Sequence, residues 1–168
     1  VDRPGIKPLI VKQALAQLKV VEVWKCDPNR MKVEYESNKI YHELMPENAP
    51  EVYFYDEENY AYGREAVPET SSTWKENLMN GLIDFEVARK SIETLNVVHN
   101  KCAGNRNIAK RFADKTIFYN LRINPYIEFT VQKHPELKSD ADRVIQEMTQ
   151  NSITLVHGDY SPKNIMIQ

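Results

Sequence analysis

Ile153-Thr154-Leu155-Val156 is an apolar, β-prone run that leads into the polar loop His157-Gly158-Asp159-Tyr160-Ser161-Pro162-Lys163-Asn164, and the apolar run Ile165-Met166-Ile167 follows it. This pattern predicts a strand, a loop and a second strand. Such a frame would hold the acid and the amide of the loop rigidly where a ligand can bind.

The loop combines three side chains that suit phosphate chemistry. The carboxylate of Asp159 can orient and deprotonate a hydroxyl, and the amide oxygen of Asn164 can bind a hard cation. The ammonium group of Lys163 can neutralise phosphate charge. The simpler interpretation is a polar surface turn that bends at Ser161-Pro162.

Composition describes an ordinary globular protein and excludes several classes. The chain has 168 residues, of which 42% are hydrophobic and 27% charged, and a net charge of -2. This charge gives no reason to expect nucleic acid or an anionic membrane as a partner. Cys26 and Cys102 match neither a zinc site nor a disulfide framework. With no membrane-spanning run and no signal peptide in the sequence, we expect a cytoplasmic protein.

Strand and helix patterns divide the chain into a mixed first part and a mostly helical second part. Strands are expected at 8–14, 18–24, 50–56 and 60–66, and a helix is expected from the N-cap Asp27, followed by Pro28, to about residue 44. A break follows at 67–72, and Thr73-Trp74-Lys75-Glu76 is a capping-box pattern. Helices are then expected at 84–102, 107–121, 125–133 and 139–149, punctuated by Asn124-Pro125 and His134-Pro135.

A lysine and a glutamate in the first part form a second candidate site. Lys12 interrupts an apolar strand, so its amine lies either at a solvated edge or in a cleft that supplies an anion. Glu36 falls on the helical stripe of Val33 and Ile40, where an unpaired carboxylate would be costly. Glu34 falls on the opposite, solvated face. The pattern therefore predicts an ion pair between Lys12 and Glu36.

These motifs together resemble one enzyme family. His157-Gly158-Asp159 followed by Asn164 resembles the catalytic loop of the aminoglycoside phosphotransferase and choline kinase superfamily, whose protein-kinase relatives carry H-R-D-x-x-x-x-N. Leu9-Ile10-Val11-Lys12-Gln13-Ala14 and Pro50-Glu51-Val52-Tyr53 resemble the methylthioribose-kinase-like members. Segments 121–126 and 134–137 resemble the helical lobe of bacterial members.

The resemblance implies an α+β, protein-kinase-like two-lobe fold that is incomplete. Residues 1–67 would be part of the β-rich N-lobe, and residues 68–168 part of the helical C-lobe. The implied activity is transfer of the γ-phosphoryl of ATP, bound with Mg²⁺, to a hydroxyl of a small molecule of aminoglycoside, choline or sugar type. The patterns indicate no particular oligomeric state.

The resemblance also assigns roles to individual residues. Lys12 would hold the α- and β-phosphates, oriented by Glu36, while Asp159 would position the acceptor hydroxyl and accept its proton. Asn164 would bind Mg²⁺, and Lys163 would contact the transferred phosphoryl group. The adenine base would bind backbone groups of a hinge at the strand end, made of Arg64, Glu65, Ala66 and Val67.

Two departures from the family pattern lead to a further expectation. Only Gly5 stands where a glycine-rich phosphate loop would precede Lys12, and the second metal-binding aspartate would follow Gln168. The sequence thus resembles the middle of a kinase, and we expect this segment to be inactive by itself. The alternatives are a nucleotide-binding or scaffolding pseudokinase and a helical interaction domain without a nucleotide site.

Overall fold

The chain folds into helices and small antiparallel sheets, as a computed structural model describes for residues 8–15 and 26–168. This mixture confirms the α+β class. The elements are β1 (Leu9–Gln13), α1 (Arg30–Leu44), β2 (Val52–Asp56), β3 (Ala61–Glu65), β4 (Ser72–Thr73), α2 (Trp74–Met79), α3 (Phe85–Cys102), α4 (Arg106–Arg111), α5 (Thr116–Phe118), η1 (Tyr119–Glu128), α6 (Phe129–Lys133), η2 (Pro135–Leu137), α7 (Lys138–Gln150), η3 (Pro162–Asn164) and β5 (Met166–Ile167).

Contacts divide the chain into two compact units. Among the described residues, the first unit contains 8–14, 28–101 and 159–168, and the second contains 15, 26–27 and 102–158. The first unit therefore contains the sheet, α1 and most of the loop His157–Asn164. The expected boundary near residue 67 does not coincide with this division, because the following segment through α2 and most of α3 belongs to the same unit as the sheet.

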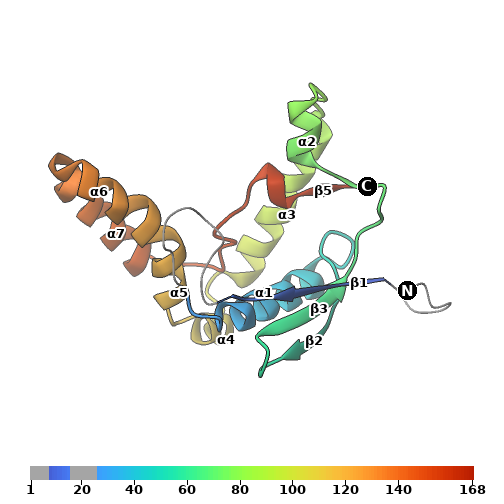
Figure 1. Ribbon diagram of the computed structural model, residues 1–168, viewed down its shortest axis with the longest axis horizontal. Coiled ribbons are helices and arrows are strands. Elements are labelled where there is room, and N and C mark those ends of the chain that lie inside the picture. Colours follow the sequence, from blue (N-terminus) through green and yellow to red (C-terminus); the bar gives the residue numbers. More distant parts are fainter. Residues whose placement is uncertain (1–7, 16–25) are drawn as a thin grey trace. The chain divides into compact units, whose positions relative to one another are not determined.

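The larger sheet has the order β1-β3-β2, and both neighbouring pairs are antiparallel. The predicted hairpin between β2 and β3 is confirmed. Its turn is closed by Asp56, whose carboxylate accepts hydrogen bonds from the backbone N–H of Asn59 at 3.0 Å and from its side-chain amide at 2.8 Å. The helix α1 packs against β2 and β3 (Figure 1).

Aromatic side chains form the interface between this sheet and α1. Ala14, Met31 and Tyr62 are buried there, and partly buried hydrophobic residues pack around them: Tyr35, Val52, Tyr55 and Tyr60. The rings of Tyr35 on the helix and Tyr55 on the strand stack with centroids 5.3 Å apart. Since buried aromatic rings contribute large apolar areas, this stack fixes α1 on one face of the sheet.

The start of α1 differs from the expectation. The helix begins at Arg30 with Asn29 as its N-cap, not with Asp27 as the cap and Pro28 as the first helical residue. The reason is that the Pro28 carbonyl accepts a bond from the N–H of Met31 at 3.0 Å, which forms a turn before the helix. The strand expected at 18–24 lies outside the described residues.

The capping box at the start of α2 is confirmed. The Thr73 hydroxyl accepts a bond from the N–H of Glu76, whose carboxylate accepts one from the N–H of Thr73 at 2.7 Å. The strand β4 just before it pairs with β5. The prediction of another strand, at residues 153–156 before the loop, is wrong. The Ile153 carbonyl accepts a bond from Gly104 at 3.3 Å, in place of a ladder with a neighbouring strand.

The second unit is helical, but its breaks differ from the expected ones. The helix expected at 107–121 is interrupted after Arg111, and α5 starts where Asp114 accepts a bond from the N–H of Thr116 at 2.8 Å. Pro125 lies inside the π-helix η1 and does not end it. A π-helix bonds each N–H to a carbonyl five residues back, so the proline ring avoids its usual clash. Pro135, in contrast, does end α6, as predicted.

Across residues 8–15 and 26–168, none of the helices combines the length and the apolar character that a bilayer span demands.

An aromatic ring that packs closely over a glycine in the middle of β3 generates a stability prediction. Gly63 is buried and pairs with Phe54, and a Cβ at Gly63 would lie 2.7 Å from Cζ of the Phe54 ring. We expect Gly63→Ala to lower the free energy of unfolding by about 1–3 kcal/mol, the usual cost of overpacking. Urea denaturation measures this loss.

The same substitution in a Phe54→Ala protein tests whether the ring causes the loss of stability. In a Phe54→Ala protein the ring is gone, so Gly63→Ala should cost much less than in the wild type. Equal losses in both backgrounds would show that the ring is not the reason.

Candidate functional site

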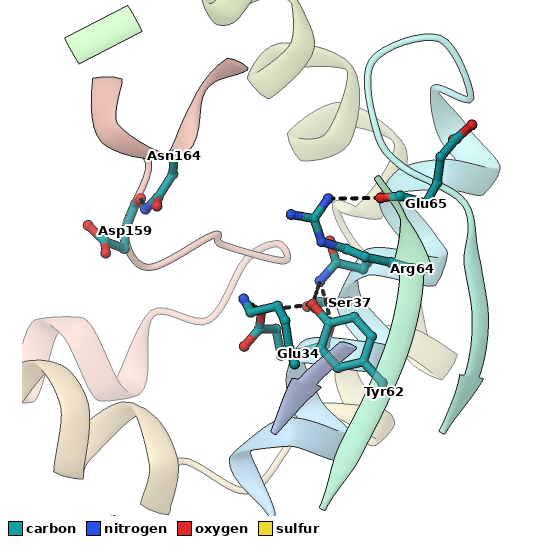
Figure 2. A network of polar contacts seen from close by, with 9 residues as sticks. Glu34, Ser37, Tyr62, Arg64, Glu65, Asp159 and Asn164 are labelled. Atoms are coloured by element: carbon teal, nitrogen blue, oxygen red, sulfur yellow. Dashed lines mark hydrogen bonds and ion pairs between the residues drawn. The ribbon is translucent and has the colours of Figure 1, made fainter. Parts of the chain in front are cut away.

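An ion pair joins β1 to α1. The ammonium group of Lys12 bonds Oε1 of Glu34, and the two side chains are 42% and 34% exposed. The Tyr62 hydroxyl donates to the same oxygen at 2.8 Å, and the Asn38 side-chain amide donates to that hydroxyl at 3.4 Å. Figure 2 shows the Glu34 carboxylate and the Tyr62 hydroxyl pointing toward each other. Lys12 therefore lies on the edge strand β1, half-exposed, with Glu34 as its anion.

The partner of Lys12 is Glu34, and the prediction of Glu36 is wrong. The prediction took Val33 and Ile40 as the stripe that faces the sheet. Val33 is 39% exposed, however, and the residues of α1 that pack on the sheet are Met31 and Tyr35. Glu34 lies three residues after Met31, so the two share one face of α1.

Tyr62 is the most enclosed member of this group. It is 1% exposed and stands directly opposite Lys12 in the pairing of β1 with β3. The ammonium nitrogen of Lys12 lies 5.9 Å from the centre of the Tyr62 ring. Burial raises the pKa of Tyr62 well above its usual range, and the negative charge and hydrogen bond of Glu34 raise it further. The phenol therefore stays protonated and donates to Glu34.

The second residue of the loop His157–Asn164 has a positive φ. Gly158 has φ 76°, a conformation that other residues adopt only with strain. Within the second unit, the Arg122 guanidinium of η1 donates a hydrogen bond to the Gly158 carbonyl. This contact holds the backbone just before Asp159.

Within the first unit, short-range bonds order the remainder of the loop. Lys163 pairs with Oδ2 of Asp159 at 2.9 Å, and the Asn164 side-chain amide donates to the Asp159 backbone carbonyl, also at 2.9 Å. The Tyr160 hydroxyl donates to the carbonyl of Ser91 on α3 at 2.6 Å. Burial raises the pKa of Tyr160, so this anchor stays protonated. The three predicted loop residues thus form one bonded cluster.

The amide of Asn164 is oriented in a way that suits a cation. Its nitrogen is committed to the Asp159 carbonyl, so the opposite end of the amide presents oxygen Oδ1 as a neutral ligand. Over residues 8–15 and 26–168, no three His, Cys, Asp or Glu side chains are grouped for a metal. A cation here would take its other ligands from phosphates and water, as Mg²⁺ commonly does.

The expected hinge is largely used within the sheet. The N–H of Glu65 donates to the Glu51 carbonyl at 2.8 Å, and the N–H of Ala66 donates to the Pro8 carbonyl at 3.1 Å. A guanidinium nitrogen of Arg64 donates to the Glu65 carbonyl at 3.4 Å. An adenine base could bind these two N–H groups only by breaking sheet bonds.

The structure thus gathers the predicted residues into two groups of one compact unit. Lys12 stands with Glu34 in one group, and Asp159 stands with Lys163 and Asn164 in the other. Figure 2 shows Asp159 and Asn164 side by side on their loop.

Sequence reasoning missed three residues of the first group: Glu34, Tyr62 and Asn38. A signal for Glu34 and Asn38 was their spacing of four, which places them on one helical face. Tyr62 carried a weaker signal, since only the strand register reveals that it faces Lys12.

Neither the protein-family models nor the curated proteins include a match to this chain.

The raised pKa of Tyr62 generates a prediction on alkaline stability. An unfolded tyrosine loses its proton near pH 10.0, whereas folded Tyr62 keeps it. Above that pH the unfolded state binds fewer protons, so the free energy of unfolding falls by up to about 1.4 kcal/mol per pH unit. Urea denaturation at a series of alkaline pH values measures the slope.

A Tyr62→Phe protein is the control, because it lacks this titration and should show a shallower slope. Tyr55 and Tyr160, whose pKa values burial also raises, contribute to both proteins. Identical slopes would mean that folded Tyr62 ionises normally.

Proposed function

We propose that this chain is part of an ATP-dependent phosphotransferase. Such an enzyme transfers the γ-phosphoryl of MgATP to a hydroxyl of a small molecule. One observation carries the proposal. A strand lysine is paired with a helix glutamate in the same compact unit as a loop that carries an aspartate and, five residues later, an asparagine. Protein kinases use a strand lysine, a helix glutamate and such a loop to hold ATP and the acceptor.

The first group would serve the nucleotide. Lys12 would bind the α- and β-phosphates, and Glu34 takes the orienting role that the sequence assigned to Glu36. The Lys12 side chain is 42% exposed, so phosphate oxygens can reach its ammonium group while Glu34 holds it. Adenine would then bind near Val67.

The second group would serve the acceptor. The Asp159 carboxylate would accept the proton of the attacking hydroxyl, and Lys163 lies 2.9 Å from its Oδ2. Lys163 would also stabilise the charge on the transferred group. Asn164 would hold Mg²⁺, which when bound would neutralise phosphate charge.

An aspartate variant tests the proposal in the full-length protein. We expect Asp159→Asn to reduce phosphoryl transfer from labelled ATP to small hydroxyl acceptors by about 10²–10⁴-fold, the usual contribution of a positioned general base. The acceptors would be aminoglycosides, choline and sugars. Asp142→Asn is the matched control, because Asp142 on α7 is exposed and pairs with Lys138 at 2.7 Å. Its rate should match the wild type.

Two results would contradict the proposal. The first is an Asp159→Asn protein as active as the Asp142→Asn control. The second is a wild-type protein that binds MgATP in calorimetry but transfers phosphate to no acceptor, which would indicate a pseudokinase.

A further inference from the structure

We propose that Tyr62 is a positioning residue of the nucleotide site, which fixes the Glu34 carboxylate so that Glu34 can orient Lys12. The proposal rests on the proposed function for its catalytic consequence. The structural part of the proposal, that Tyr62 restrains Lys12 through Glu34, does not depend on that function.

The geometry places two donors on one oxygen. Both the Lys12 ammonium and the Tyr62 hydroxyl bond Oε1 of Glu34. A glutamate side chain has three rotatable bonds and loses considerable freedom when it is held. The hydroxyl provides a fixed point for Oε1, and Lys12 then meets the carboxylate in one position.

The hydroxyl itself is rigidly placed. Tyr62 is buried in the centre of β3, and its ring packs with Ala14 and Met31 in the sheet–helix core. The Asn38 amide, one helical turn after Glu34, donates to the Glu34 backbone carbonyl at 2.8 Å and, with its nitrogen 3.4 Å away, to the Tyr62 hydroxyl. Because Asn38 supplies a hydrogen to this oxygen, the phenolic hydrogen is directed to Glu34.

Tyr55 supplies a matched control within the same cluster. It packs against the same core and stacks on Tyr35, yet its buried hydroxyl contacts no hydrogen-bond partner among the described residues. Tyr55→Phe and Tyr62→Phe therefore remove the same atom from the same core, and only the second removes a bond to Glu34.

Chemical labelling of Lys12 tests the restraint without any assay of activity. An amine-acylating reagent is applied to the folded full-length protein, and mass spectrometry follows modification at Lys12. We expect Tyr62→Phe to raise the rate of labelling by about tenfold, the factor for one hydrogen bond to a charged group, because released Glu34 no longer covers the amine. Tyr55→Phe should leave the rate unchanged, and unchanged labelling in Tyr62→Phe would overturn the proposal.

Kinetics of the full-length protein test the consequence. Tyr62→Phe should lower kcat/KM for ATP by about tenfold while KM for the acceptor stays constant, a split that general loosening of the fold would not produce. If labelling rises but the protein neither binds nor uses ATP, the restraint is right and the proposed function fails. If Tyr62→Phe does not fold, Asn38→Ala should raise labelling to a smaller extent, and its failure to do so would also overturn the proposal.

Discussion

The contact between Lys12 and Glu34 is the constraint on which the site depends. It joins β1 to α1 across 22 residues of sequence. Since both side chains are about a third or more exposed, the pair should stabilise the fold by roughly 1 kcal/mol or less. The aromatic interface with Tyr35 and Tyr55 holds the helix on the sheet far more strongly. The main effect of the pair is therefore to fix the position of the Lys12 ammonium group, which remains partly exposed to solvent.

The loop that begins at His157 follows the same principle. Its second residue, Gly158, has a positive φ, and the Tyr160 hydroxyl bonds it to α3. Lys163 and Asn164 then each bond Asp159, which precedes them by four and five residues. Local bonds of this kind keep an acid, a cation and an amide in fixed relation without a large core. Both groups thus place charged side chains by means of short contacts on a rigid support, which is what phosphate chemistry requires.

Much of the fold could be predicted from the sequence, because local signals determine it. The hairpin, the capping box before α2 and the helix α7 follow from turn residues, a cap and helical periodicity. The partner of Lys12 could not be predicted in this way. Periodicity describes how apolar a helical face is, but which face is buried depends on the packing of the helix against the sheet. In α1 the face that packs on the sheet carries Met31 and Tyr35. Likewise, the strand expected at Ile153–Val156 depended on a partner strand that no local pattern specifies.

The affinity for MgATP of two glutamate variants tests the central claim most directly. Calorimetry of the full-length protein would compare Glu34→Gln with Glu36→Gln, which remove the same charge from the same helix two residues apart. Glu34→Gln should weaken binding by about tenfold, whereas Glu36→Gln should remain within about twofold of the wild type. Equal effects of the two variants, or a larger effect of Glu36→Gln, would contradict the assignment of Glu34 as the residue that orients Lys12.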